Sequence, residues 1–306
     1  MRQQNLTNMK KLTYEEAIEL LQKVKRLTGK QSEQINRLAN ALLDGRRSLA
    51  SDRQKAITLY RLAAERGCRV AEFNLGVCYD KGTGVPQNYE TAVEWYQKSA
   101  KHGYYFAMTN LAHFYHYGDG VNQDNTIAVY WLKRAVHRGD TLAKRLLADC
   151  YHYGYGIRKN MPKAVRLTME AAEEGDVQAQ SDMAWYYYKG IVVEKSLEKE
   201  IFWAQKAAKG GDSNCQNTMG CYYLEGVGVE KDTEKGITLL RKAARKKDEN
   251  AALNLAESYR KGIGVERNLK ESLRWYRLAK SWCIDLDYDK LEKEIKEVKE
   301  MMKHEI

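Results

Sequence analysis

Apolar residues recur along most of the chain at the three- and four-residue spacing of amphipathic helices. In the stretch NYETAVEWYQKSAKHG the apolar positions are Ala92, Trp95, Tyr96 and Ala100, which a helix would place on one face. Each such stretch is only about a dozen residues long, which is marginal for an isolated helix. We therefore predict many short helices that pack in antiparallel pairs.

The same pattern returns every 36 residues, which is typical of a repeat protein. A column of tyrosines and a column of glycines keep this step without a slip, and a Leu or Met followed by Ala or Gly precedes each tyrosine. A second glycine comes two residues after the first in every repeat but one, where Val192 replaces it. The tyrosines are Tyr79, Tyr115, Tyr151, Tyr187, Tyr223 and Tyr259, and the glycines are Gly82, Gly118, Gly154, Gly190, Gly226 and Gly262.

A third column predicts where the second helix of each repeat begins. Every member is of a type whose side-chain oxygen accepts an otherwise unpaired backbone N–H at a helix N-terminus. These residues are Asp52, Asn88, Asp124, Asn160, Ser196, Asp232 and Asn268. Glycines are expected to end the second helices in a left-handed conformation, at Gly67, Gly103, Gly139, Gly175 and Gly211.

Because short helices need neighbours, each repeat must pack against the next. The expected fold is all-α, a right-handed α-solenoid of about seven helix–turn–helix repeats. The predicted organisation is an N-terminal tail and capping helix at 1–33, the repeats at 34–281 and a C-terminal capping helix at 282–306.

The two terminal helices are predicted at residues 13–28 and 286–303, each with an apolar stripe on a charged background. Thr13 and Glu16 have capping-box spacing at the start of the first. We interpret both as covers for the ends of the solenoid; the alternative is that one of them binds a partner or a second copy.

The segment LGVCYDKGTGVPQNYETAVEWYQKSAKHG at 75–103 resembles a Sel-1-like repeat, a relative of the tetratricopeptide repeat. The resemblance implies an adaptor or scaffold for protein–protein interaction, with no catalytic residues and no cofactor. The chain departs from the family pattern at Val192, Lys247 and Lys280. One secreted branch of the family pairs cysteines within each repeat, and this chain lacks that pairing.

The net charge of +10 raises the possibility of a nucleic-acid partner. Residues 1–66 carry +7 and residues 241–306 carry +4, whereas residues 67–240 carry −1. A neutral middle speaks against a nucleic-acid channel along the repeats. The alternative function is a binder of nucleic acid or of an anionic surface that uses the basic ends, including Lys10, Lys11, Lys23, Lys25, Arg26, Arg46 and Arg47.

The six cysteines show no CxxC motif and no regular spacing, which is typical of reduced thiols in a cytosol-like compartment. They are Cys68, Cys78, Cys150, Cys215, Cys221 and Cys283. No apolar run has the length of a secretory signal or a membrane span. We therefore expect a cytoplasmic protein without a membrane span.

The candidate catalytic motifs consist of residues that the repeat columns already explain. Ser196 and Lys199 match an S-x-x-K motif, but Ser196 belongs to the capping column and the partner motifs are missing. The G-x-G pairs follow helices and lack a third glycine, so they are predicted to be turns. Three histidines at 113, 116 and 152 could bind a transition metal, but Asp149 is the only further ligand in view. We expect neither an enzyme nor a metal or cofactor site.

The first helix of each repeat is expected to line the concave side of the solenoid, the default binding surface of such folds. The middle repeats place aromatic residues, His and Arg where a solvated face would carry Lys, Glu and Ser, and such side chains are frequent interface anchors. We predict a groove for a protein or peptide centred on repeats three to five; the alternative is that these rings pack only among themselves. The predicted partner-binding residues are Phe73, Phe106, His113, His116, Tyr117, Arg145, Asp149, His152, Tyr153, Trp185, Tyr188 and Lys189.

Overall fold

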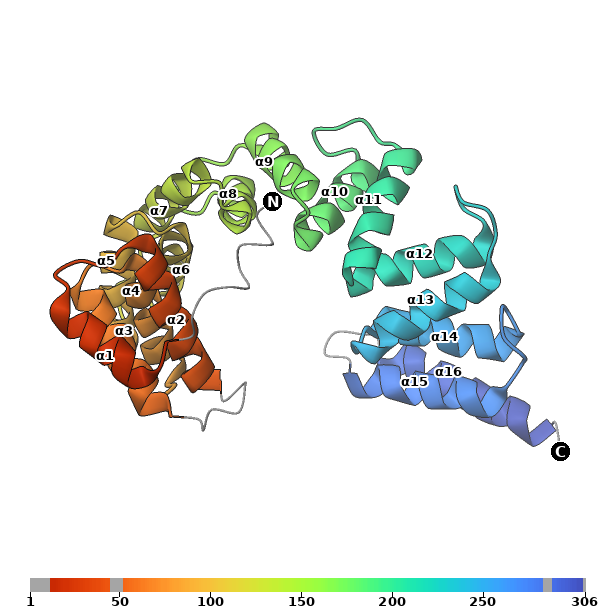
Figure 1. Ribbon diagram of the computed structural model, residues 1–306. Coiled ribbons are helices and arrows are strands. Elements are labelled where there is room, and N and C mark those ends of the chain that lie inside the picture. Colours follow the sequence, from red (N-terminus) through yellow and green to blue (C-terminus); the bar gives the residue numbers. More distant parts are fainter. Residues whose placement is uncertain (1–11, 45–51, 283–287, 305–306) are drawn as a thin grey trace. The chain divides into compact units, whose positions relative to one another are not determined.

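The computed structural model describes residues 12–44, 52–282 and 288–304, and every regular element within these ranges is an α-helix (Figure 1). The chain divides into two compact units, residues 1–160 and 161–306. Each unit is considered by itself. The limits predicted for the terminal segments, at 33/34 and 281/282, stay predictions.

The first unit contains α1 (Tyr14–Lys23), α2 (Gly29–Asp44), α3 (Arg53–Glu65), α4 (Arg69–Lys81), α5 (Tyr89–Lys101), α6 (Tyr105–Tyr117), α7 (Asn125–His137) and α8 (Thr141–Tyr153). The second unit contains α9 (Met161–Glu173), α10 (Val177–Lys189), α11 (Leu197–Gly210), α12 (Ser213–Glu225), α13 (Thr233–Arg245), α14 (Glu249–Lys261), α15 (Leu269–Trp282) and α16 (Tyr288–His304).

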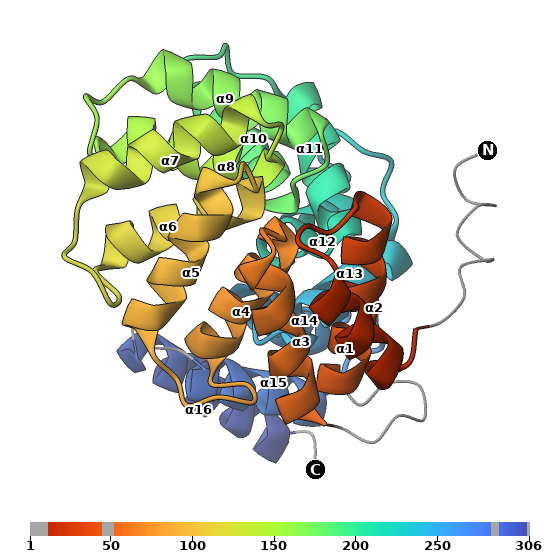
Figure 2. The same cartoon turned by 60° about the vertical axis from the view of Figure 1, so that its left-hand side comes forward.

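From α2 to α15 the helices alternate between the first and second helices of the repeats. Within each unit, repeat helices that follow one another along the chain pack on each other, as α5 does between α4 and α6 (Figure 2). Some first helices of successive repeats also touch, such as α2 and α4, where Asn74 Nδ2 of α4 donates to Asn36 Oδ1 of α2 at 3.2 Å. Neighbouring repeats therefore stabilise one another. The predicted all-α solenoid fold is confirmed.

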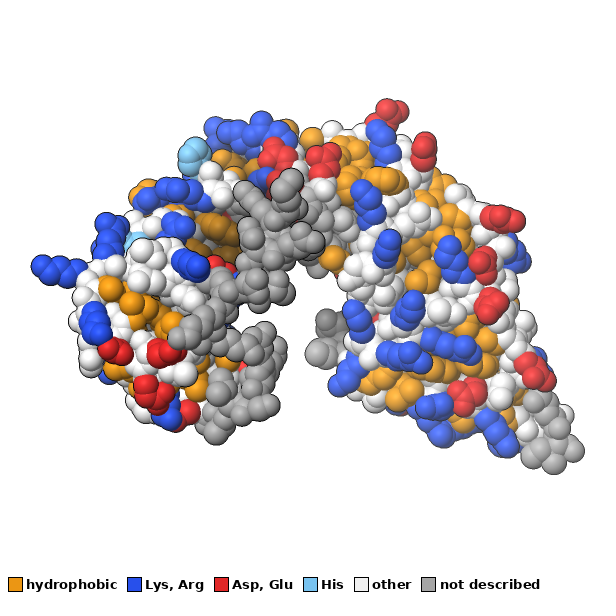
Figure 3. Space-filling model, in the orientation of Figure 1, with side chains coloured by type: hydrophobic (Ala, Val, Ile, Leu, Met, Phe, Trp, Pro, Cys, Tyr) orange, Lys and Arg blue, Asp and Glu red, His pale blue; other side chains and the backbone are white. Residues whose placement is uncertain are grey.

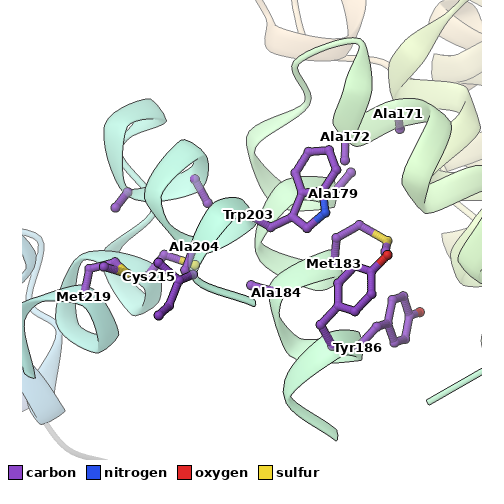
Figure 4. Packing of buried hydrophobic residues seen from close by; sticks show 14 of the residues in the cluster. Ala171, Ala172, Ala179, Met183, Ala184, Tyr186, Trp203, Ala204, Cys215 and Met219 are labelled. Carbon is purple, nitrogen blue, oxygen red and sulfur yellow. The ribbon is translucent and has the colours of Figure 1, made fainter. Parts of the chain in front are cut away.

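Small residues of the repeat columns lie where helices pack most closely. A Cβ atom at Gly76 would lie 2.8 Å from the ring of Tyr96, which is fully buried. Large residues fill the remaining space. Figure 4 shows Trp203 of α11 beside Ala179 and Met183 of α10, all three buried. The alternation of small and large residues gives each helix pair its spacing.

The second glycine of the turn is required for two reasons. Gly120 has φ +64°, and a Cβ atom there would lie 2.5 Å from the carbonyl carbon of Tyr89. Val192 takes the corresponding place in a later repeat with φ 64°, and Lys247 takes a helix-ending glycine's place with the same φ. The departures from the family pattern at these two positions therefore keep the backbone that glycine adopts.

The predicted capping column is confirmed where the side-chain bonds are seen. Six of its members accept a backbone N–H from the first turn of a second helix, namely Asp52, Asn88, Asp124, Ser196, Asp232 and Asn268. A further column, which the sequence analysis missed, caps the first helices at Asp140, Asp176, Asp212 and Asp248. Helices α4 and α6 instead begin after Cys68 and Tyr104, without a side-chain cap bond.

Helix α1 is shorter than predicted, although its capping box is confirmed. It ends at Lys23 because a new helix begins a few residues later. Thr28 Oγ1 accepts a hydrogen bond from the backbone N–H of Gln31, and Gln31 Oε1 accepts one from the backbone N–H of Thr28. This second capping box starts α2 and divides the apolar stripe, which had suggested one helix to residue 28.

Helix α16 packs its apolar side onto α15. Leu291 and Val298 are buried there in one cluster with Leu273 and Tyr276. Lys280, the third departure from the family pattern, forms an ion pair with a glutamate of α16. The residue that breaks the repeat column is therefore used to hold the terminal helix.

Candidate functional site

Helix α6 carries no Lys, Arg, Asp or Glu side chain, and its exposed surface is aromatic. Near its C-terminal end the ring of His113 lies 4.5 Å from that of Tyr117, and the ring of His116 lies 4.7 Å from Tyr117. Tyr117 nevertheless remains 61% exposed. Three predicted site residues thus form one group of rings that faces solvent.

Helix α8 and the turn after it extend this group. The ring of Tyr155 lies 5.3 Å from His116 and stacks on Tyr153 at 5.4 Å, and Tyr153 lies 4.5 Å from His152. Tyr153 is 60% exposed. We call His113, His116, Tyr117, Tyr153 and Tyr155 the ring cluster.

Hydrogen bonds fix His116 in the ring cluster, and partial burial lowers the pKa of His113. His116 Nδ1 donates to Oδ1 of Asn125, the first residue of α7, at 2.6 Å. Gln123 Nε2 donates to the backbone oxygen of His116 at 2.7 Å. Burial lowers the pKa of His113, because the charged form loses hydration. His113 is therefore neutral at neutral pH.

Phe73 and Phe106 lie near the N-terminal end of α6, whereas Arg145 and Asp149 lie on α8 with Tyr153. Phe73 is half-buried and lies 5.2 Å from Tyr104 and 6.3 Å from Phe106, at the N-terminal end of α6. Arg145 and Asp149 form an ion pair on α8, with 3.8 Å between Nη1 and Oδ2. Phe73 thus has a packing role, whereas Phe106 is 45% exposed.

In the second unit, Trp185 and Tyr188 are exposed by 43% and 45% on α10. Lys189 Nζ lies 4.9 Å from the centre of the Tyr188 ring, and Lys195 Nζ lies 5.4 Å from it. The predicted residues of repeat five thus share one helix. The continuous groove over repeats three to five stays a prediction.

Tyr155 was missed by the sequence analysis because it occupies the middle of a G-x-G turn, which we interpreted only as a connection. Its signal was present in the sequence. The other repeats carry Thr83, Asp119, Ile191, Val227 or Ile263 there, so an aromatic ring at this position stands out.

The basic residues proposed for the alternative function are only partly described. Lys10, Lys11, Arg46 and Arg47 lie outside the described residues, as does Cys283. Lys23 pairs with Glu19, whereas Lys25 and Arg26 are exposed. Figure 3 shows further Lys and Arg side chains across α13 and α15 of the second unit.

In the described part of the chain, no three His, Cys, Asp or Glu side chains lie close enough to hold a metal ion. No helix there has the length and apolarity to cross a membrane. The five described cysteines are free thiols, and the expected cytoplasmic location stays a prediction.

A model of the Sel1 repeat family matches seven consecutive segments of the chain. They are residues 35–68, 69–104, 106–140, 141–176, 177–212, 213–248 and 250–281. The chain belongs to the Sel1 repeat family. Sel1 repeat proteins generally mediate protein–protein interactions and are generally non-enzymatic.

Solved Sel1 repeat structures are similar in sequence and in fold. One is c5321, a protective antigen present in uropathogenic Escherichia coli strains with an SLR fold, which is 28% identical with a TM-score of 0.76. The match covers 88% of this chain but only 56% of c5321. Another, a Sel1 repeat protein from Oxalobacter formigenes, is 28% identical with a TM-score of 0.72, over 82% of this chain and 99% of that one. No curated protein matches the chain.

Proposed function

We propose that this Sel1 repeat chain is a non-catalytic scaffold that binds a segment of a partner protein on the ring cluster of α6 and α8. The observation that carries the proposal is the exposure of Tyr117 and Tyr153, at 61% and 60%. Tyrosine is enriched among the residues that dominate binding energy at protein interfaces. Trp185 and Tyr188 of α10 form a second proposed contact area.

The fold itself does not require tyrosine at these two positions. Tyr117 and Tyr153 are the last residues of their helices, and the other repeats carry Lys81, Lys189, Glu225 and Lys261 there. Charged residues satisfy the same position in four repeats. The two tyrosines therefore serve something other than repeat packing.

The rings do pack among themselves, as the alternative hypothesis expected, but this packing leaves their outer faces open. The contacts within the ring cluster and the bond from His116 to Asn125 hold the rings in place before a partner arrives. Binding then loses less side-chain entropy than binding to mobile rings would. Self-packing and partner binding are therefore compatible.

The chemistry of the surface favours an apolar segment of the partner. Helix α6 carries no Lys, Arg, Asp or Glu side chain, and on α8 Arg145 and Asp149 form an ion pair with each other. A strongly charged segment would therefore lose hydration against α6 without gaining an opposite charge there. We expect apolar and aromatic side chains of the partner to lie against Tyr117 and Tyr153.

The test compares capture of partners by the intact chain and by the double variant Tyr117→Lys/Tyr153→Lys. Both replacements introduce the residue that other repeats carry at this position. The control is Glu225→Lys, which changes the same position of another repeat and the net charge by the same amount. We expect the double variant to lose a partner that the control keeps, and a photo-crosslinker at position 153 to capture that partner.

The proposal is wrong if the double variant, with its helical circular dichroism intact, keeps every partner that the control keeps. It is also wrong if partner loss always accompanies loss of helical structure. In that case the rings act only in folding.

A further inference from the structure

A cavity of about 840 Å³ lies in the first unit, where the turn from α1 to α2, the helix α2 and the turn from α3 to α4 meet. Its lining is strongly basic. Five Lys and Arg side chains border it against one carboxylate, that of Glu33. The basic residues are Lys25, Arg26, Arg37, Arg66 and Arg69, and His102 lies beside them.

Part of this basic lining is held in place by the fold. The guanidinium of Arg66 donates from Nε to the backbone oxygen of Val24 at 3.3 Å and from Nη1 to that of Leu62 at 3.0 Å. Neutral carbonyl oxygens orient this cation without cancelling its charge. Its carboxylate neighbour, Glu65, lies 3.5 Å away and is more than half exposed.

The remaining charges leave a positive excess. Arg37 pairs with Glu33, and His102 Nδ1 lies 2.8 Å from the buried carboxylate of Glu72. Among the described residues no carboxylate lies within ion-pair distance of Lys25, Arg26 or Arg69. Cations gathered around one cavity repel one another unless an anion lies between them.

The repeat pattern shows where an anion would fit. In four later repeats an aspartate caps the first helix; Asp176, for example, accepts from the backbone N–H of Ala179 at 2.8 Å. In the second repeat Cys68 takes this place, without a side-chain cap bond. Cys68, Arg69 and the next residue all border the cavity. The N-terminal end of α4, where the helix dipole favours an anion, thus lies beside the basic lining.

We propose that this cavity binds a small molecule that carries two or more phosphoryl groups. Guanidinium groups match the geometry of phosphate oxygens, and several cations around one cavity suit a ligand with several negative charges. The cavity volume is in the range of small-molecule sites. None of its lining residues belongs to the ring cluster, so the proposal is independent of the scaffold function.

The first test titrates pyrophosphate into the full chain by calorimetry at low salt. We expect saturable binding at one site. Cys68→Asp places a carboxylate where the other repeats have one, and should weaken pyrophosphate binding by about tenfold or more, as expected for losing a charge-assisted contact. Cys68→Asn introduces a side chain with the shape of aspartate but without its charge, and should weaken pyrophosphate binding less than Cys68→Asp does.

A second pair of variants tests the cations and does not depend on position 68. Lys25→Gln/Arg69→Gln should weaken pyrophosphate binding by about tenfold or more. Lys242→Gln/Arg245→Gln removes the same amount of charge from exposed positions of α13. This control pair should leave pyrophosphate binding unchanged. Circular dichroism checks that each variant is folded.

Three results would overturn the proposal. One is the absence of saturable pyrophosphate binding to the full chain. Another is equal weakening by the cavity pair and the α13 pair, which would mean a general charge effect. The third is citrate binding as tightly as pyrophosphate, which would show a site for polycarboxylates rather than phosphoryl groups. The variant Tyr117→Lys/Tyr153→Lys should bind pyrophosphate normally, which separates this site from the ring cluster.

Discussion

Helices α6 and α8 of the first unit and α12 and α14 of the second occupy equivalent places in their repeats, yet they offer different surfaces. At the end of the helix, α6 and α8 carry Tyr117 and Tyr153, whereas α12 and α14 carry Glu225 and Lys261. One turn earlier, α6 has His113 and α14 has Glu257. The two pairs of helices share a scaffold and differ in what they expose.

The charged surface of α14 is neutralised within the chain. Glu257 accepts from Arg260 at 2.8 Å and from Lys261 at 2.6 Å, and Arg260 also reaches Glu294 of α16 at 2.9 Å. The rings of α6 and α8 have contacts too, but their outer faces remain open. Buried columns therefore define the fold, and exposed columns are where repeats of one chain differ in the surface that they offer.

Substitutions in the buried columns should have the largest effects on the free energy of unfolding, and these effects should be similar in α6 and α14. Leu111 and Leu255 are fully buried at equivalent positions of α6 and α14. Leu111→Ala and Leu255→Ala should each lower the free energy of unfolding of their own unit by about 2–5 kcal/mol. Urea denaturation followed by circular dichroism measures this. If one substitution proved neutral, the two helices would not share a scaffold.

Loss of a helix cap should come next in size. Asn88 of the first unit and Asp232 of the second each cap a second helix from an exposed position. Asn88→Ala and Asp232→Ala should each cost about 0.5–2 kcal/mol of unfolding free energy, and the double variant should show the sum. Thermal melting of the three variants tests this. A strongly non-additive result would mean that the caps do more than end their helices.

The turn of repeat five should gain stability from the residue that the other repeats use. Val192 has φ 64°, a conformation that costs a β-branched residue energy and glycine none. Val192→Gly should therefore raise the unfolding free energy by about 0.5–1 kcal/mol, after the entropy cost of glycine. A lower melting temperature for this variant would show that the exposed valine makes a contact of its own.

The smallest effect is a difference in pH dependence between the two surfaces. Burial lowers the pKa of His113 from 6.5 in the folded chain. As the pH falls, the unfolded chain therefore binds a proton at this residue at a higher pH than the folded chain does. Stability contributed by His113 is present above pH 6.5 and falls as the pH drops below it. His113→Asn should flatten the dependence of the melting temperature on pH just below 6.5.

Glu257 of α14 should act in a lower pH window. Burial opposes its ionisation, but hydrogen bonds from Arg260 and Lys261 outweigh burial and hold its pKa below 4.5. Its contribution is present above pH 4.5 and is lost as the pH falls through the lowered pKa. Glu257→Gln should flatten the pH dependence only there. Identical profiles for the two variants would contradict the assignment.

Most of the fold could be predicted because each repeat carries the same local signals. The cap at Asn88 and the turn at Gly120 each depend on a few neighbouring residues, and the 36-residue period repeats each signal in most of the repeats. The division of the N-terminal stripe at Thr28 was missed because the apolar spacing continues across it. The start of α2 depends on the side-chain hydrogen bonds of its capping box, and the spacing of apolar residues does not indicate such bonds.

The candidate site was harder to predict, because it depends on which rings meet. The sequence predicted that His116, Tyr117 and Tyr153 lie on first helices, and the structure places them on α6 and α8. Tyr155 stands out in its column of the sequence, but only the folded turn shows that its ring lies 5.3 Å from that of His116. Phe73 was named as a binding residue, although much of its ring is committed to Tyr96 and Tyr104. Whether any of these residues binds a partner stays a prediction.

The main helix contacts within each unit join neighbours along the chain, such as α4 with α5 and α12 with α13. A whole 36-residue module could thus be added or removed at a repeat boundary while the joints on either side keep their form. Duplication of a module would supply a second set of residues at the exposed positions. This set could change its chemistry while the original set stays the same. An architecture of this kind lets new specificities arise without a new fold.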